Sequence, residues 1–182
     1  GEGRLKRALV TGAAGFVGAN MARRLLAEGI EVHLLLRPDG DAWRVAELAG
    51  SCAFHSVDLL DATAISALIG STKPDAVFHF ATYGAYSQQN DLGLAIDTNV
   101  KGLYHLLEAC QSAGVGILVN AGTSSEYGHK DHAPKESETL EPNSFYAIAK
   151  SAATHLCRFY ASRHGLRAPT LRLYSAYGPW EE

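Results

Sequence analysis

Short apolar runs alternate along the chain with longer segments in which apolar residues recur at the spacing of a helix. The apolar runs predict six strands, at residues 8–11, 31–37, 53–57, 76–81, 116–121 and 168–174. The longer segments predict helices at residues 15–29, 41–48, 61–68, 92–113 and 143–164. This alternation is typical of a parallel sheet whose strands are joined by crossover helices. We therefore expect an α/β fold, a doubly wound parallel sheet flanked by helices.

Length and composition limit the functional classes. The 182 residues, 47% of them hydrophobic, suffice for one domain that spans residues 1–182. Sixteen basic and nineteen acidic side chains give a formal net charge of −3 without a basic stripe, which argues against a nucleic-acid partner. The apolar runs have the length of strands, so we expect no membrane span. Three scattered cysteines, Cys52, Cys110 and Cys157, suggest reduced thiols and a cytoplasmic location.

A glycine-rich loop follows the first predicted strand and reads Thr11-Gly12-Ala13-Ala14-Gly15-Phe16-Val17-Gly18. Gly12 would allow a tight turn, Gly15 would let the backbone approach a pyrophosphate, and Gly18 would let the helix pack closely on the strand. The N-terminus of that helix offers N–H groups and a positive dipole to phosphates. Such glycine spacings also occur by chance in loops. Between a strand and an amphipathic helix, however, this one predicts a Rossmann-type NAD(P)-binding domain.

The end of the second predicted strand bears on the choice between NAD and NADP. An acidic residue there usually binds the ribose 2′-hydroxyl of NAD, whereas this chain has Arg37. The guanidinium of Arg37, supported by Arg44, would instead clamp a 2′-phosphate, so we predict NADP. Asp39 is close enough in sequence to keep NAD as the alternative.

Two further strand ends supply candidate cofactor contacts. Asp58 ends the third strand, where its carboxylate would either accept from the adenine amino group or cap the helix that starts near Asp61. Ala81, Thr82 and Tyr83 follow the fourth strand, at the edge where a doubly wound sheet binds its ligand. We therefore expect both segments to lie against the dinucleotide.

Tyr146 and Lys150 lie four residues apart in a predicted helix and therefore share one of its faces. A free phenol has a pKa of about 10, so about one in a thousand is ionised at neutral pH. A nearby ammonium that lowers this pKa by roughly three units, equivalent to about 4 kcal/mol, would make Tyr146 a usable acid/base. The alternative is a half-buried tyrosine and a solvent-facing lysine without chemistry, but the glycine loop favours the catalytic interpretation.

The longest predicted loop, residues 122–142, is polar. It begins with the hydroxyls of Thr123, Ser124 and Ser125, at the same sheet edge as the glycine loop. A hydroxyl there could bind a substrate oxygen that alternates between alcohol and ketone, although such turns are also common without function. Further along, His129 and His132 lack a third metal ligand, so we predict a solvated loop and no metal site.

These motifs together resemble the extended short-chain dehydrogenase/reductase family, which comprises nucleotide-sugar epimerases, dehydratases and 4-ketoreductases. The resemblance covers essentially the whole chain. Besides the glycine loop, it rests on Asp58-Leu59, Val77-Phe78-His79-Phe80-Ala81, Asn99-Val100 with Gly102, Leu106-Leu107-Glu108-Ala109-Cys110, Thr123 to Gly128, Tyr146 to Lys150, and Leu171-Arg172 with Tyr177-Gly178-Pro179.

The resemblance implies a role for each matching residue. Tyr146 is expected to be the catalytic acid/base, Lys150 to bind the nicotinamide ribose and lower the pKa of Tyr146, and Thr123 to be the active-site hydroxyl. The implied reaction moves hydride between the nicotinamide and C4 of a nucleotide-diphosphate sugar, through a 4-keto sugar. The expected cofactor contacts are Gly12, Gly15, Phe16, Val17, Gly18, Arg37, Asp58, Leu59, Ala81, Thr82, Tyr83, Asn99, Tyr146, Lys150 and Tyr174.

Departures from the family pattern narrow the expected activity. The family's dehydratases carry an acid shortly after the active-site hydroxyl, whereas Ser124 and Ser125 follow Thr123 and Glu126 comes one place too late. We therefore expect an epimerase or a 4-ketoreductase, with a 4,6-dehydratase or a non-catalytic NAD(P)-binding regulator as the alternatives. Ser175 stands where the family often has an asparagine that contacts the substrate.

The resemblance carries two further expectations about architecture. The substrate domain that follows the Rossmann domain in the family is expected to be absent from residues 1–182. The helices at residues 92–113 and 143–164 correspond to family helices that pair across a two-fold axis. The resemblance therefore implies a homodimer held together by a four-helix bundle.

Overall fold

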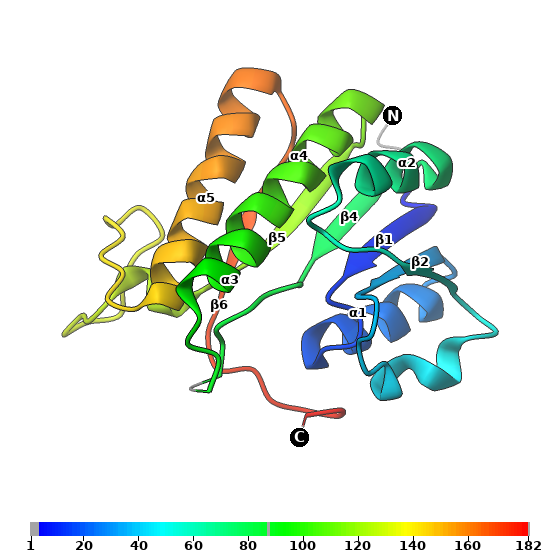
Figure 1. Ribbon diagram of the computed structural model, residues 1–182. Coiled ribbons are helices and arrows are strands. Elements are labelled where there is room, and N and C mark those ends of the chain that lie inside the picture. Colours follow the sequence, from blue (N-terminus) through cyan, green and yellow to red (C-terminus); the bar gives the residue numbers. More distant parts are fainter. Residues whose placement is uncertain (1–3, 87, 182) are drawn as a thin grey trace.

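Six parallel strands form one sheet, in the order β3-β2-β1-β4-β5-β6, in the computed structural model, which describes residues 4–86 and 88–181 (Figure 1). The strands are β1 (Arg7–Thr11), β2 (Glu31–Leu36), β3 (Ala53–Ser56), β4 (Ala76–His79), β5 (Ile117–Thr123) and β6 (Thr170–Leu173). Each pair of neighbouring strands is parallel. The predicted Rossmann-type doubly wound sheet is confirmed. Of the predicted domain, residues 1–3, 87 and 182 lie outside the described residues.

Helices cover both faces of the sheet. Helix α1 (Phe16–Ala27) and the 3₁₀ helix η1 (Trp43–Leu48) pack on one face, and α2 (Ala62–Thr72), α4 (Gly102–Ala113) and α5 (Phe145–His164) pack on the other (Figure 1). A separate apolar core lies on each face of the sheet. Successive residues of β1 belong in turn to one core and the other, because successive side chains of a strand point to opposite faces. Within residues 4–86 and 88–181, no helix has the length and apolar character needed to cross a membrane.

The side of the sheet on which successive strands are added changes between β1 and β4. It adds β2 and then β3 on one side of β1, and it adds β5 and then β6 on the other side of β4. The two central strands are neighbours, with Thr11 paired beside His79. The segments that follow β1 and β4 therefore leave the same edge and continue on opposite faces. Such a switch point is where doubly wound sheets bind their ligands.

Three predicted helices differ from those observed. The segment expected at residues 41–48 is a 3₁₀ helix, and α2 continues past residue 68 because Ile69 and Thr72 are buried, ending where Lys73 turns left-handed before Pro74. The helix expected at 92–113 is divided by a π-helical turn. It consists of α3 (Leu92–Ile96), the π-helix η2 (Asp97–Lys101) and α4.

The ends of the last two strands also differ from prediction. Strand β5 reaches Thr123, two residues further than expected, and the 3₁₀ helix η3 (Ser124–Tyr127) follows it at once, inside the predicted loop. Strand β6 begins only at Thr170, because Pro169 has no N–H with which to continue the pairing. The result brings the Thr123 side chain to the rim of the sheet.

Gly18, where α1 packs closely on the glycine loop, and Gly70, at an open position of α2, should respond in opposite ways to substitution by alanine. A Cβ on Gly18 would lie 2.2 Å from the carbonyl oxygen of Gly12, whereas a Cβ on Gly70, within α2, would have nothing within 4 Å. We expect Gly18→Ala to lower the free energy of unfolding by about 1–3 kcal/mol through overpacking. Gly70→Ala should raise it by roughly 0.5–1 kcal/mol through helix propensity. Urea denaturation followed by circular dichroism measures both, and equal effects would contradict the packing argument.

Candidate active site

The glycine loop is pressed against the segment that follows β4. Gly12 has a left-handed backbone with a φ of +64°, and a Cβ on it would lie 2.4 Å from the backbone of Phe80 and Ala81. A Cβ on Gly18 would in turn strike the backbone of Gly12. Glycine is therefore required at both positions by contacts within the chain. This close approach fixes the loop at the switch point of the sheet.

The N-terminus of α1 opens at this loop. Gly15 caps the helix without a side-chain hydrogen bond, and the first turn contains no acidic residue. The first-turn N–H groups, those of Phe16 and Val17 among them, have no partner within the helix, as in any α-helix. Together with the helix dipole, these donors suit a pyrophosphate. The residues present thus fit a dinucleotide.

The two candidate arginines at the adenosine end differ in their contacts. Arg37 directly follows β2 and is exposed, and its side chain forms no hydrogen bond or ion pair within residues 4–86 and 88–181. Arg44, expected to support it, is buried in η1 and donates to the carbonyl oxygens of Trp180 at 2.8 Å and Ala14 at 3.3 Å. Arg44 therefore ties the glycine loop to the C-terminal residues, and only Arg37 is left to meet a 2′-phosphate.

Asp58 and Leu59 follow β3, the neighbour of β2. The Asp58 carboxylate is exposed and accepts from the Leu60 N–H at 2.9 Å. Asp61, not Asp58, caps α2, because its side chain accepts from the Ala64 N–H at 2.9 Å. The capping alternative for Asp58 is therefore wrong, and Asp58 remains an exposed carboxylate at the rim, while Leu59 belongs to the apolar core.

Asn99 fixes the segment that follows β4. It is buried in the π-helix η2, and its Oδ1 accepts from the Tyr83 N–H at 2.9 Å and from the Thr82 hydroxyl at 3.0 Å. Its Nδ2 donates to the Tyr83 carbonyl at 2.7 Å. Gly84, just beyond, lies beside Tyr146, because a Cβ added to it would be in van der Waals contact with the tyrosine side chain at 3.5 Å. Asn99 thus holds this segment against the tyrosine.

Tyr146 lies in the first turn of α5 and is half-buried. Burial raises the pKa of its phenol, and the negative charge of Glu126 adds to that rise, whereas the nearby hydroxyls of Thr82 and Thr123 oppose it. The expected lowering of this pKa is therefore wrong for the chain by itself, because burial is the largest effect. The expected neighbour Thr123 is present, and Thr82 is a second hydroxyl beside the phenol.

Lys150 lies one helical turn after Tyr146 and is only 4% exposed. Burial lowers the pKa of its ammonium to about 8, and the charges of Glu126 and Cys157 oppose this shift. Within the described residues the ammonium has no hydrogen bond or ion pair. A buried cation without acceptors is unfavourable, and ribose hydroxyls would supply the acceptors. This arrangement fits a nicotinamide cofactor.

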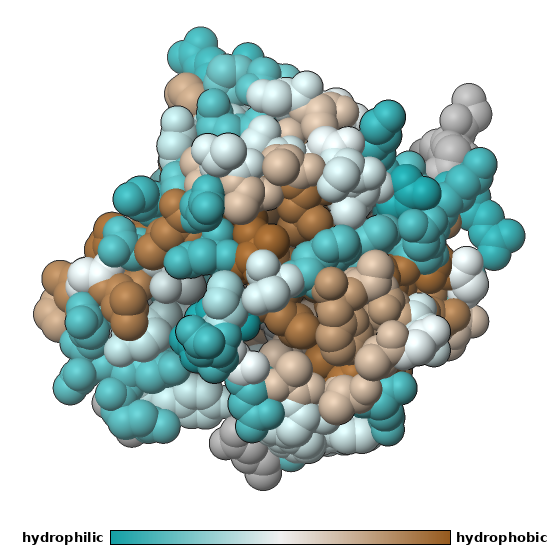
Figure 2. Space-filling view, turned by 45° about the vertical axis from the view of Figure 1, so that its right-hand side comes forward, coloured by the Kyte–Doolittle hydropathy of each residue, from teal (hydrophilic) through white to brown (hydrophobic). Residues whose placement is uncertain are grey.

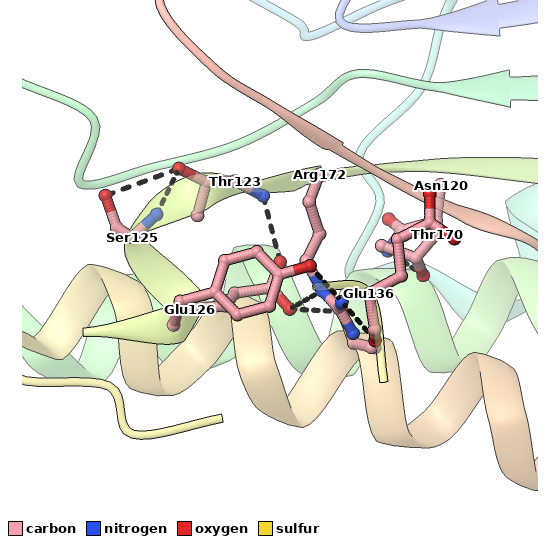
Figure 3. Close-up of polar contacts among 9 residues, drawn as sticks. Asn120, Thr123, Ser125, Glu126, Glu136, Thr170 and Arg172 are labelled. Atoms are coloured by element: carbon pink, nitrogen blue, oxygen red, sulfur yellow. Dashed lines mark hydrogen bonds and ion pairs between the residues drawn. The ribbon is translucent and has the colours of Figure 1, made fainter. Parts of the chain in front are cut away.

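A fully buried carboxylate adjoins Thr123, and the sequence had suggested only that it was a displaced acid (Figure 3). Glu126 accepts from the Thr123 N–H at 2.9 Å, from the Thr154 hydroxyl at 2.6 Å and from the Arg172 Nε at 3.4 Å. Arg172 also donates to the Tyr127 hydroxyl at 2.7 Å. A signal was present in the sequence, because Thr123 and Glu126 have the spacing of a capping box.

An open cavity of about 340 Å³ lies beside the residues that follow Thr123. Its lining is mostly polar and includes Ser124, Ser125, His129, Lys130, Asn143 and Tyr174. Tyr174, an expected cofactor contact, thus contributes to this cavity from the end of β6. His132 also lines it, and the carboxylates of Asp131 and Glu138 raise the pKa of its imidazole. No group of three or more potential metal ligands gathers in the part of the chain that the structure describes.

The expected residues gather at one edge of the sheet. The glycine loop packs against Ala81. Tyr146 contacts the segment after β4, which Asn99 holds in place, and lies near the hydroxyl of Thr123. Arg37 and Asp58 stand at the ends of the adjacent strands β2 and β3. The fold and the glycine loop define the class as a dinucleotide-binding domain.

Comparison with known proteins identifies the family. The NAD dependent epimerase/dehydratase family matches residues 8–182, and the chain belongs to this family. UDP-glucose 4-epimerase 2 of Oryza sativa subsp. japonica is 35% identical over 167 residues, which are 86% of this chain and 41% of that protein. The predicted resemblance is confirmed.

Solved structures agree with this assignment. UDP-glucose 4-epimerase from Thermus thermophilus, in complex with NAD, superposes with a TM-score of 0.87 at 34% identity, and the match covers 97% of this chain and 57% of that one. A dTDP-glucose 4,6-dehydratase from Streptomyces venezuelae, also with NAD bound, gives a TM-score of 0.87 at 32% identity over 96% and 57% of the two chains. The chain spans about half the length of the relatives that it matches.

Proposed function

We propose that this chain is the cofactor-binding and catalytic domain of a nucleotide-sugar 4-epimerase or 4-ketoreductase. One observation carries the proposal. The Tyr146 phenol lies near the hydroxyls of Thr82 and Thr123, one helical turn from the buried ammonium of Lys150. A phenol, a cation and a positioned hydroxyl at the edge that holds a dinucleotide are what a reversible alcohol oxidation requires.

The side chains divide the proposed chemistry among them. NAD or NADP, when bound, supplies the acceptor or donor of hydride at the sugar C4. Tyr146 takes the proton of the C4 hydroxyl on oxidation and returns a proton to the 4-keto oxygen on reduction. Thr123 hydrogen-bonds to the same oxygen and orients it. Lys150 binds the ribose hydroxyls of the nicotinamide nucleoside, because its buried ammonium has N–H donors that the described part of the chain leaves unused.

A 4,6-dehydratase is the less favoured alternative, although a dehydratase is among the solved relatives. Elimination of water across C5 and C6 needs an acid next to the active-site hydroxyl, and Ser124 and Ser125 hold those positions. Glu126 is fully buried, and both its carboxylate oxygens accept hydrogen bonds from the protein. It therefore does not meet the sugar.

The cavity beside Ser124 and Ser125 is the proposed place of the hexose. Its hydroxyl, amide, imidazole and ammonium groups suit a polyhydroxylated ligand. Ser124 and Ser125 directly follow Thr123, so a sugar in this cavity would lie between the end of β5 and Tyr174 at the end of β6. The proposed substrate is accordingly a nucleotide-diphosphate sugar.

Replacement of Tyr146 by phenylalanine tests the acid/base role. In the full product of the gene, we expect Tyr146→Phe to lower turnover of a nucleotide-diphosphate sugar by about 10²–10⁴-fold, because the proton carrier is lost. NAD binding, measured by calorimetry, should persist, because the glycine loop is untouched. Tyr104→Phe, at an exposed site on α4, is the control and should leave both unchanged. Full turnover by Tyr146→Phe with cofactor bound would favour the non-catalytic regulator.

Arg37 distinguishes the two cofactors. NAD is the cofactor in the family's description and in the solved relatives above, whereas the predicted preference for NADP rests on Arg37. If that prediction holds, Arg37→Ala should weaken NADP binding about 10–100-fold, since hydrogen bonds to charged groups contribute roughly 1.5–3 kcal/mol, and leave NAD nearly unchanged. Titration of each cofactor measures this, with Arg24→Ala on α1 as the control. An equal effect on both cofactors would exclude a 2′-phosphate clamp.

The proposed homodimer pairs α4 and α5 with their copies. Apolar side chains reach the surface among polar ones (Figure 2), and Tyr104 on α4 and both Ile148 and Phe159 on α5 are among the exposed large ones. Helices α4 and α5 lie side by side on one face of the sheet (Figure 1). Two such pairs would complete a four-helix bundle and cover this surface.

A charge placed on α5 tests the dimer. We expect Phe159→Glu to convert the chain to monomers in analytical ultracentrifugation, because a carboxylate would be buried in an apolar interface. Leu171→Glu is a matched control, since Leu171 is 51% exposed and Phe159 52%, but Leu171 lies on β6. A monomeric parent chain at micromolar concentration would refute the proposal.

The cytoplasmic location remains a prediction. Cys52, Cys110 and Cys157 are all free thiols, and Cys110 and Cys157 are buried. Buried thiols are compatible with a reducing compartment. Cell fractionation with an antibody to the chain would test the location, and recovery outside the cytoplasm would refute it.

A further inference from the structure

The carboxylate of Glu126 joins three elements behind the proposed site (Figure 3). Its Oε1 accepts from the backbone N–H of Thr123, at the end of β5. Its Oε2 accepts from the hydroxyl of Thr154, one turn after Lys150 on α5, and from the guanidinium of Arg172 on β6. The Glu126 side chain is fully buried and that of Arg172 is 10% exposed. This pair therefore lies beneath the rim, out of reach of a sugar.

Glycine at position 122 makes room for this carboxylate. A Cβ on Gly122 would lie 2.5 Å from the Glu126 Oε1, so glycine at that position admits the carboxylate. Arg172 extends the contacts outward, because its guanidinium also donates to the Glu136 carbonyl at 3.2 Å. The loop that follows η3 is thereby fastened to the same pair.

We propose that Glu126 is a positioning residue of the proposed site: its carboxylate fixes the Thr123 backbone to α5 and β6, and its negative charge stabilises the ammonium of Lys150. The catalytic role in this inference rests on the proposed function. The contacts of Glu126 and its effect on Lys150 do not depend on that function and can be measured without substrate. A carboxylate serving solely as a fold anchor would need its hydrogen bonds and its ion pair with Arg172, but no effect on Lys150.

Among the described residues, few charged groups act on the ammonium of Lys150, and Glu126 is one of them. The groups that act on its ammonium are Glu126 on η3 and Cys157 on α5, both of which raise its pKa, and it in turn lowers the pKa of His79 on β4. Around the Tyr146 phenol stand the hydroxyls of Thr82 and Thr123 and the charge of Glu126. Glu126 is thus the one carboxylate among these groups, and it acts on both proposed catalytic side chains.

The charge is tested by Glu126→Gln, which keeps the shape and a carbonyl acceptor for the Thr123 N–H. In the parent chain labelled with ¹³C-lysine, we expect the Lys150 side-chain signal, assigned with Lys150→Met, to titrate with a midpoint near pH 8. Loss of an opposite charge disfavours the ammonium, so the midpoint should fall by at least about half a pH unit in Glu126→Gln. Thr154→Val, which removes a hydrogen bond but no charge, is the matched control and should leave it unchanged.

The positioning is tested by hydrogen exchange at the Thr123 amide. Glu126→Gln should keep this amide protected, because the carboxamide oxygen still accepts its hydrogen bond. Glu126→Ala should lose the protection, because no acceptor remains. Protection that survives in Glu126→Ala would overturn the positioning role.

Further outcomes decide the electrostatic part. An unchanged Lys150 midpoint in folded Glu126→Gln would overturn it. If that variant does not fold, the double variant Glu126→Gln with Arg172→Gln removes both partners of the buried ion pair, and Arg172→Gln alone serves as its reference. A midpoint in the double variant below that of Arg172→Gln supports the proposal, and an equal one overturns it. These measurements need no turnover, so failure of the proposed function in Tyr146→Phe remains distinguishable from failure here.

Discussion

The close approach of two backbones between β1 and β4 is the constraint on which the rest of the site depends. At Gly12 the chain after β1 comes so near to Phe80 and Ala81 that a methyl group has no room. This contact sets the start of α1 and the path of the segment after β4. Asn99 then holds that segment from the π-helical turn, and the segment in turn packs on Tyr146. The tyrosine and the glycine loop are thus placed relative to one another by backbone packing, before any ligand binds.

Several ionisable groups lie beneath this rim, where they contribute little to stability. Burial lowers the pKa of His79 to about 3, and its ring pairs with the Thr11 hydroxyl at 2.6 Å. Lys150 is a buried ammonium, and Glu126 with Arg172 is a buried ion pair. Removal of such groups from water generally offsets most of the attraction between them. Their presence at one edge is therefore better explained by chemistry and by specificity of structure than by stabilisation of the fold.

Much of the fold could be predicted from sequence, because the local signals and the tertiary contacts agree. The alternating apolar runs predicted all six strands, and the helices expected to end at residues 113 and 164 do end there, followed by the left-handed Gly114 and Gly165. The π-helical turn was not predicted, and within it Asn99 hydrogen-bonds to Tyr83, sixteen residues earlier in the chain. Propensity and periodicity contain no information about such a contact.

The candidate site was less predictable than the fold, because its chemistry depends on burial. Sequence spacing correctly put Tyr146 and Lys150 one turn apart, but it could not show that Lys150 is buried and not solvent-facing. The expected effect on the Tyr146 pKa has the wrong sign for the same reason, since desolvation of the phenol outweighs the neighbouring groups. Glu126 lies one place too far from Thr123 for the acid of the family's dehydratases, and the Thr-x-x-Glu spacing indicates instead that the carboxylate folds back on the Thr123 N–H.

The balance of charges around Tyr146 has a consequence for the direction of the proposed reaction. Glu126 disfavours the phenolate of Tyr146 and favours the ammonium of Lys150, so one carboxylate keeps a proton on both groups. A protonated phenol is the form that donates to a ketone oxygen, so the groups around Tyr146 favour the form that the reduction step of the proposed function would use. Oxidation of a C4 hydroxyl requires the opposite form and therefore needs the Tyr146 proton to leave first. Burial of Tyr146 and the charge of Glu126 therefore work against the oxidation step of the proposed function.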